Sequence, residues 1–158
     1  EAVEGFTAAL QAYREAGDRA KAAEMANNLS VALLLGGRAR DALRAVQDTP
    51  QVFHEVGDRG REAQAWANLA SAQEACGDLG AAERSYRRAV DLFASLGDSE
   101  NQAHCLRSLS QLQLRRGQVM EASLTARSAI EAKGGRPRGV ARLLQWLLGL
   151  LARLTGRP

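Results

Sequence analysis

An interval of forty residues recurs along this chain and limits its fold more than any other feature. Gly-Asp pairs begin at Gly17, Gly57 and Gly97. Three further sets keep the same interval: Gly37, Gly77 and Gly117; Ala42, Ala82 and Ala122; Leu29, Leu69 and Leu109. Self-similarity at such a period is the signature of a protein built from stacked structural units. The sequence therefore predicts a repeat array.

The segments between the glycines have the apolar spacing of helices. In residues 59–76, Ala63, Trp66, Leu69 and Ala70 fall on one helical face. Each glycine suits the left-handed position after a helix end, and the aspartate that follows suits the N-cap of the next helix. The pattern predicts eight helices, at about residues 1–16, 19–36, 38–56, 59–76, 78–96, 99–116, 118–133 and 138–155. Because the links are short, neighbouring helices should run antiparallel.

The third of these helices contains a local conflict. Pro50 would remove a backbone donor and clash one turn back if it stood in a helix interior. The run Asp48, Thr49 and Pro50 instead reads as an N-cap followed by a proline at a helix start. We therefore expect a kink or break near residues 47–50.

The predicted fold class is all-α: a right-handed superhelical solenoid of antiparallel helix pairs, followed by a C-terminal amphipathic helix. Residues 1–135 should form the solenoid, with a half repeat at 1–16 and full repeats at about 17–56, 57–96 and 97–135. Residues 136–158 should form the basic C-terminal helix. Because the sequence begins with Glu1 rather than Met, we expect it to be part of a longer protein.

The second unit carries a resemblance to a known family. It places Trp66, Leu69, Ala70, Ala82, Tyr86 and Ala89 at the spacing of the tetratricopeptide repeat (TPR). The resemblance covers about residues 1–133, although the interval of forty exceeds the usual repeat of about 34 residues. Long repeats with Gly-Asp turns resemble those of the Pins/LGN group of G-protein modulators and of kinesin light chains. The family resemblance implies a protein-protein interaction scaffold.

The same resemblance implies that the first helix of each unit lines a concave groove for a partner protein or peptide. The groove residues we predict are Asn27, Asn28, Gln64, Asn68, Ser71, His104, Arg107, Ser108 and Gln111, together with Glu24, Val31, Ala67, Glu74 and Arg115. Amide side chains can donate to and accept from a peptide backbone. A merely solvated face is the alternative. The carboxylate clamp of chaperone-binding family members is incomplete, since only Asn68 matches it and Arg107 is a like-charge replacement.

The C-terminal segment has a different composition. Its predicted helix at 138–155 gathers Leu143, Leu144, Leu147, Leu148, Leu151 and Leu154 on one side. We consider a helix that caps the last repeat, an element for homo-oligomerisation or partner binding, and a membrane-surface contact. The last 26 residues hold six basic groups and no acid, against 15 basic and 18 acidic groups in residues 1–132. This acidic body argues against a nucleic-acid module.

Signals for catalysis are missing from the sequence. His54 and His104 stand on different units, without the spacing of a metal site, and no glycine-rich loop follows a strand. Cys76 and Cys105 are isolated, and we expect both to be small buried hydrophobes. We therefore expect no enzyme activity, no cofactor and no metal, and no apolar run reaches a membrane-spanning length of about 18 residues. The expected location is cytoplasmic.

Three functional hypotheses follow. The first is a non-catalytic scaffold that binds a peptide or helical segment of a partner in the groove. The second is a structural or oligomerisation module that depends on the Leu-rich C-terminal helix. The third is a regulatory domain of a larger protein.

Overall fold

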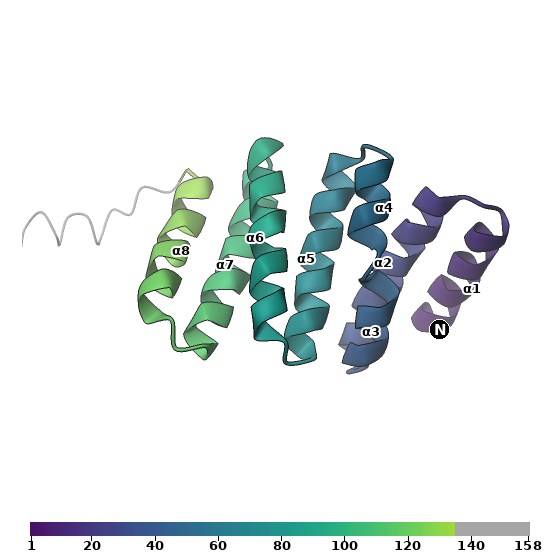
Figure 1. Ribbon diagram of the computed structural model, residues 1–158, viewed down its shortest axis with the longest axis horizontal. Helices are drawn as coiled ribbons and strands as arrows, with labels where there is room; N and C mark the ends of the chain where they lie inside the picture. The colour runs from purple at the N-terminus through teal and green to yellow at the C-terminus, as the bar shows by residue number, and fades with distance from the viewer. Residues whose placement is uncertain (135–158) are drawn as a thin grey trace, which may run out of the picture.

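The computed structural model describes residues 1–134 and has eight α-helices in that range. They are α1 (Ala2–Glu15), α2 (Arg19–Leu35), α3 (Ala39–Val46), α4 (Thr49–Glu55), α5 (Arg59–Ala75), α6 (Leu79–Ser95), α7 (Ser99–Arg115) and α8 (Val119–Ala132). Helices make up 83% of the described residues, which contain no strand. The helices pack on their sequential neighbours, from α1 at one end of the molecule to α8 at the other (Figure 1). This arrangement is consistent with a helical repeat.

Glycine and aspartate form the turns between helices as predicted. Gly17, Gly37, Gly57, Gly77, Gly97 and Gly117 all have φ between 70° and 86°. L-residues with a Cβ rarely adopt this left-handed conformation. At four of the turns an aspartate then accepts a hydrogen bond from the backbone N–H three residues later; these are Asp18, Asp58, Asp78 and Asp98. One dipeptide thus ends one helix and begins the next.

The third predicted helix is broken where Pro50 occurs. Helix α3 ends at Val46 and α4 begins at Thr49, so Pro50 lies in the first turn of α4. A proline is tolerated there because the first backbone N–H groups of a helix have no intrahelical partner. The predicted break is confirmed, and Asp48 occupies the N-cap position of α4. The Asp48 side chain makes no capping hydrogen bond, and the buried Thr49 hydroxyl instead donates to the carbonyl of Val46 over 2.9 Å.

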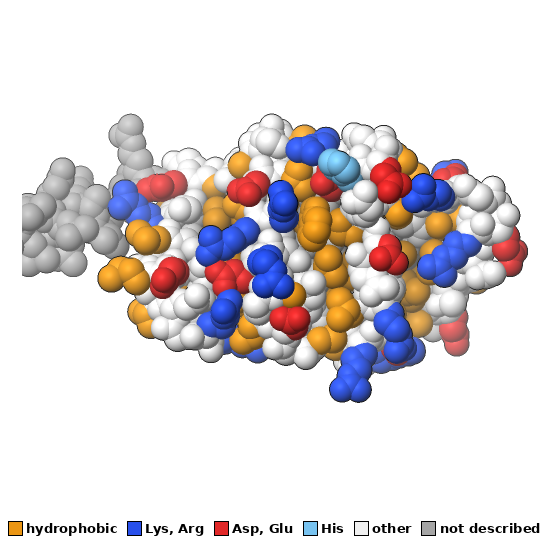
Figure 2. Space-filling view, in the orientation of Figure 1, with side chains coloured by type: hydrophobic (Ala, Val, Ile, Leu, Met, Phe, Trp, Pro, Cys, Tyr) orange, Lys and Arg blue, Asp and Glu red, His pale blue; other side chains and the backbone are white. Residues whose placement is uncertain are grey.

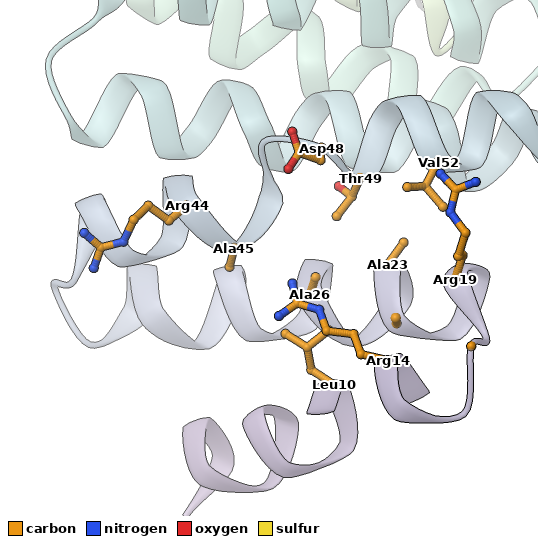
Figure 3. Close-up of a pocket in the computed structure, with 12 residues that line it drawn as sticks. Leu10, Arg14, Arg19, Ala23, Ala26, Arg44, Ala45, Asp48, Thr49 and Val52 are labelled. Carbon is orange, nitrogen blue, oxygen red and sulfur yellow. The ribbon is translucent and has the colours of Figure 1, made fainter. Parts of the chain in front are cut away.

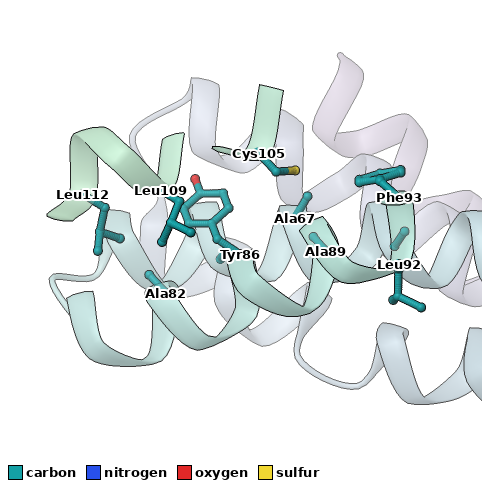
Figure 4. Close-up of a cluster of buried hydrophobic side chains, with 11 residues drawn as sticks. Ala67, Ala82, Tyr86, Ala89, Leu92, Phe93, Cys105, Leu109 and Leu112 are labelled. Carbon is teal, nitrogen blue, oxygen red and sulfur yellow. The ribbon is translucent and has the colours of Figure 1, made fainter. Parts of the chain in front are cut away.

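The alanines and leucines that recur every forty residues form much of the core; each such set of equivalent positions is called a column. Ala42, Ala82 and Ala122 are fully buried where the two helices of each unit meet, and small side chains there let the helices approach closely. Figure 4 shows the cluster in which Tyr86 of α6 lies beside Leu109 of α7, with Phe93 further along α6. A second cluster joins α1, α2, α3 and α5, and the half-buried Trp66 packs against both. Full burial of a side chain such as Phe93 contributes about 1.5–3 kcal/mol.

The helix boundaries can be compared directly with those predicted from the sequence. Each predicted helix boundary up to residue 133 agrees with the structure within about one residue, apart from the break in the third helix. The helix predicted at 138–155 lies outside the described residues. Within residues 1–134 no helix combines the length and the apolar character that a membrane span requires.

Candidate functional site

The predicted groove face belongs to three helices, α2, α5 and α7, which two ion pairs connect. Arg61 of α5 lies 3.4 Å from Glu24 of α2, measured from Nη2 to Oε2. Arg115 of α7 donates to Glu74 of α5 over 2.6 Å. The side chains that face outward from these helices therefore belong to one continuous surface, which we call the polar face.

Eight of the nine predicted site residues reach solvent on this face. Those that are exposed are Asn28, Gln64, His104, Arg107 and Gln111, and those that are half-buried are Asn68, Ser71 and Ser108. Gln64 Nε2 donates to Asn68 Oδ1 over 3.2 Å, one turn further along α5. Four of the exposed side chains make no hydrogen bond or ion pair with another residue of the range 1–134; they are Asn28, His104, Arg107 and Gln111. Within the described residues, these four side chains leave their hydrogen-bonding groups unused.

Asn27 is the exception, and its predicted place in the groove is wrong. Its side chain is only 7% exposed and faces the interior between α2 and α4. There its Oδ1 lies 2.9 Å from Thr49 Oγ1 and is a second acceptor for the hydroxyl proton that the Val46 carbonyl also accepts. The equivalent positions in the other units gave no consistent signal, because Ala67, forty residues further on, is buried and Arg107, eighty residues further on, is exposed. Asn27 therefore holds the start of α4 in place and does not line an open surface.

Tyr86 is a polar-face residue that the sequence-based set omits. Its ring is buried in the core, whereas its hydroxyl lies 3.2 Å from Ser71 Oγ and donates to Glu74 Oε2 over 3.3 Å. Burial and the adjacent charge of Glu74 raise the pKa of the Tyr86 phenol, so it stays protonated as a donor. Arg115 of α7 donates to the same Glu74 carboxylate. The middle of the polar face is thus a fixed cluster that connects α5, α6 and α7.

The opposite side of the molecule carries cavities that the sequence reading did not anticipate. One of about 340 Å³ lies between α4, α5 and α6, where His54, Glu62, Trp66, Arg88 and Leu92 contribute to its lining. Figure 2 shows Lys and Arg side chains gathered over α6 on this side, beside a strip of hydrophobic side chains next to α4. His54 Nδ1 lies 3.3 Å from the buried Glu62 carboxylate. The two sides of the molecule therefore differ in chemistry.

Comparison with known proteins identifies no relative: no family model matches the chain, and no curated protein matches its sequence. What the molecule can bind is therefore inferred from the side chains on its two surfaces.

The two cysteines have unlike environments. Cys105 is buried, as expected, and burial, with the nearby charge of Asp98, raises the pKa of its thiol to about 11. Cys76 is exposed at the C-terminal end of α5, so the expectation that it is buried is wrong. Among residues 1–134 no three His, Cys, Asp or Glu side chains are grouped closely enough to hold a metal ion.

The polar face is suited to noncovalent recognition. Asn and Gln side chains each offer two N–H donors and a carbonyl acceptor, which match the groups of a peptide backbone. Arg107 adds a planar cation that can bind a carboxylate through two parallel hydrogen bonds.

Proposed function

We propose that the chain is a non-catalytic interaction scaffold of the tetratricopeptide-repeat type, which binds a peptide or helical segment of a partner on the polar face. One observation carries this proposal. Exposed amide, imidazole and guanidinium groups without a partner among residues 1–134 share one face of the packed helices, with Asn28, His104 and Arg107 as examples. A row of this kind can hydrogen-bond an incoming chain at several points.

The repeat geometry supports the family assignment within this proposal. The left-handed glycines recur at intervals of forty and twenty residues, so each helix pair is closed by the same kind of turn. Identical turns between similar helices give a constant rotation from one unit to the next, which produces a superhelix with an extended concave surface. The right-handed solenoid and the groove are the finer description that we propose.

The ion pairs across the polar face define which charges remain for a ligand. Glu74 is paired with Arg115, and Glu24 shares Arg61 with Asp58, so both arginines are already engaged by acids of the chain itself. Arg107 has no acidic partner among the described residues. We therefore expect the ligand to present its backbone to the amides of α5 and an acidic group to Arg107. Because the helices are already packed, mainly the ligand loses conformational freedom on binding.

A peptide-display selection tests this proposal. Residues 1–158 would be immobilised, random peptides selected, and the dissociation constants of the enriched peptides measured in solution. Replacing Asn68→Ala and Arg107→Ala together should weaken binding about tenfold or more, because a few residues carry most of the binding energy. Arg88→Ala, on the opposite side, is the matched control and should leave the affinity unchanged. Selected peptides that ignore the double variant would contradict the proposal.

A second candidate function, self-association, is favoured by the outer surface of α8. This helix exposes large apolar side chains, namely Val119, Met120, Leu124 and Ile130. The last unit of a repeat array needs a cover for such surface, and the Leu-rich sequence at 138–155 follows directly. Under this alternative the C-terminal segment assembles copies of the chain and the polar face is idle.

Molar mass in solution separates the two functions. Size-exclusion chromatography with light scattering would compare residues 1–158 with the variant Leu147→Glu and Leu151→Glu. A dimer or larger assembly that the two substitutions convert to a folded monomer would favour assembly. A monomer in both cases would remove the second candidate and leave the first.

A further inference from the structure

A cavity of about 240 Å³ lies between α1, α2 and the broken helix formed by α3 and α4 (Figure 3). It opens on the side of α2 that faces away from the polar face. Ala22 and Ala26 line it, whereas Glu24 and Asn28, each two residues further along, belong to the polar face. Two residues correspond to about 200° around an α-helix, so the two surfaces point in nearly opposite directions.

The cavity has an equivalent in the next unit, and the comparison shows what is special about it. Shifting its lining residues by forty gives lining residues of the cavity between α4, α5 and α6: Leu10 becomes Pro50, Ala22 becomes Glu62, Ala26 becomes Trp66 and Val52 becomes Leu92. The second cavity has a carboxylate and an indole in its wall. The first has methyl groups at both places.

The wall of the first cavity is therefore apolar and large enough for a ring. Its floor consists of Leu10, Ala22, Ala23, Ala26, Ala45 and Val52. A cavity of about 150 Å³ lined by apolar side chains binds benzene, so about 240 Å³ has room for a larger aromatic group. Trp66 shows that a unit of this array accepts an indole at the position of Ala26, packed against both core clusters.

The rim of the cavity is basic. Three arginines line it, Arg14, Arg19 and Arg44, against the single acid Asp48. Arg19 is paired with Glu55 over 2.8 Å, and Arg44 is paired with Asp41. Arg14 has no acidic partner within residues 1–134, and Figure 3 shows its side chain extending toward the middle of the cavity. An occupant would gain most from a negative charge next to its apolar group.

From the cavity and its rim we infer that this site binds an aromatic side chain of an acidic partner segment. The chain's own last 26 residues are a poor occupant, because they hold six basic groups and no acid and so offer Arg14 no negative charge. The described chain also ends beside α8, at the opposite end of the array from α1 (Figure 1). The inference goes beyond the proposed peptide site, since it concerns the other side of the molecule and does not depend on the polar face.

A titration followed by NMR tests the inference. The probe is the capped peptide acetyl-Asp-Glu-Ala-Trp-Ala-Glu-Asp-amide, added to residues 1–158 with labelled alanine methyl groups. The expected result is saturable shifts of the methyl signals of Ala22, Ala23, Ala26 and Ala45, with a Kd of about 1 mM or lower. A peptide with Ala in place of Trp should give no saturable shifts at these methyls. A peptide with Lys in place of each acid should bind at least about threefold more weakly. Shifts confined to the polar face, or none at these alanines, would overturn the inference.

Variants make the test independent of the probe. Ala26→Leu fills the cavity and should weaken binding about tenfold, while circular dichroism reports that the fold is kept. Arg14→Glu changes an exposed side chain, so it does not depend on repacking, and it should weaken binding about threefold or more. Asn28→Ala, on the polar face, is the control and should leave the titration unchanged. Equal binding by the wild type and Arg14→Glu would overturn the acidic character of the occupant.

Discussion

The hydroxyl of Thr49 lies 2.9 Å from the side-chain oxygen of Asn27 and hydrogen-bonds to it inside the contact between α2 and α4. Both residues are buried, so water does not replace this bond when it is lost. The bond ties the first turn of α4 to the middle of α2. It also explains how the broken helix keeps its position although the Asp48 side chain makes no capping hydrogen bond.

Replacing Asn27 should destabilise the fold, whereas replacing its neighbour should not. Asn27→Ala removes one of the two acceptors that lie 2.9 Å from the buried Thr49 hydroxyl, and with it the side-chain link between α2 and α4, so it should lower the free energy of unfolding by about 1–2 kcal/mol. Asn28→Ala, which changes an exposed side chain, should stay within about 0.5 kcal/mol of the wild type. Urea unfolding of the two variants measures both values, and equal losses would contradict the buried role of Asn27.

The glycine turns predict substitutions of opposite sign. Gly77 has φ +86°, so Gly77→Ala places a Cβ in a left-handed conformation and should cost about 1–2 kcal/mol. Gly60 lies in the first turn of α5, where an added Cβ would have as its nearest neighbour the Asp58 carboxylate at 3.8 Å. Gly60→Ala should therefore stabilise by about 0.5–1 kcal/mol. Thermal unfolding compares them, and a stabilising Gly77→Ala would show that the turn is not left-handed.

The two cysteines should differ strongly in reactivity. At pH 8 the exposed Cys76 should react readily with a thiol reagent, whereas Cys105, with a pKa of about 11, should remain protonated as well as shielded. Two pKa units above the usual 9.0 correspond to about a hundredfold less thiolate. Counting modified thiols over time should give one fast site, with the second appearing only in denaturant. Two fast sites in the native protein would contradict the burial of Cys105.

Asp98 gives the fold a predictable dependence on acid. Hydrogen bonds from the Asn101 side chain and backbone N–H lower the pKa of its carboxyl below the usual 3.8. The carboxylate therefore stabilises the folded state above the usual pKa, and this contribution is lost as the pH falls through the lowered value. The urea midpoint of Asp98→Ala should lie below that of the wild type at pH 6, and the difference should shrink at pH 3. A difference that does not change with pH would mean that the carboxylate plays no such part.

The fold was largely predictable from the sequence because its determinants are local. Gly57 and Asp58 end one helix and begin the next through hydrogen bonds to residues a few positions away. The helix boundary can therefore be predicted without knowledge of the tertiary structure. Pro50 likewise predicted the break between α3 and α4, because its ring and its missing N–H disfavour a helix interior. The alanine columns, repeated at the same interval, marked the positions where helices approach closely.

The site was less predictable because it depends on contacts between units. Helical periodicity placed Asn27 and Asn28 in the same row, and only the position of Thr49 after the break decides that Asn27 turns inward. The ion pair between Glu74 and Arg115 was only weakly indicated by the sequence: the two opposite charges are 41 residues apart, which places them at nearly equivalent positions of neighbouring units. The sequence also held an indication of the apolar cavity, because Ala26 is small where the equivalent residue of the next unit is Trp66. Its volume depends on the packing of three helices and could not be read from one column.

The most direct test of the proposed scaffold is to record the side-chain amide signals of the ¹⁵N-labelled chain during titration with a selected peptide. Each Asn and Gln NH₂ group reports its own surroundings, so the face that binds is identified without substitutions. We expect saturable shifts for Asn28, Gln64, Asn68 and Gln111, with the buried Asn27 signal unchanged. Shifts restricted to the amides of the opposite side, such as Gln51, with none on the polar face, would contradict it.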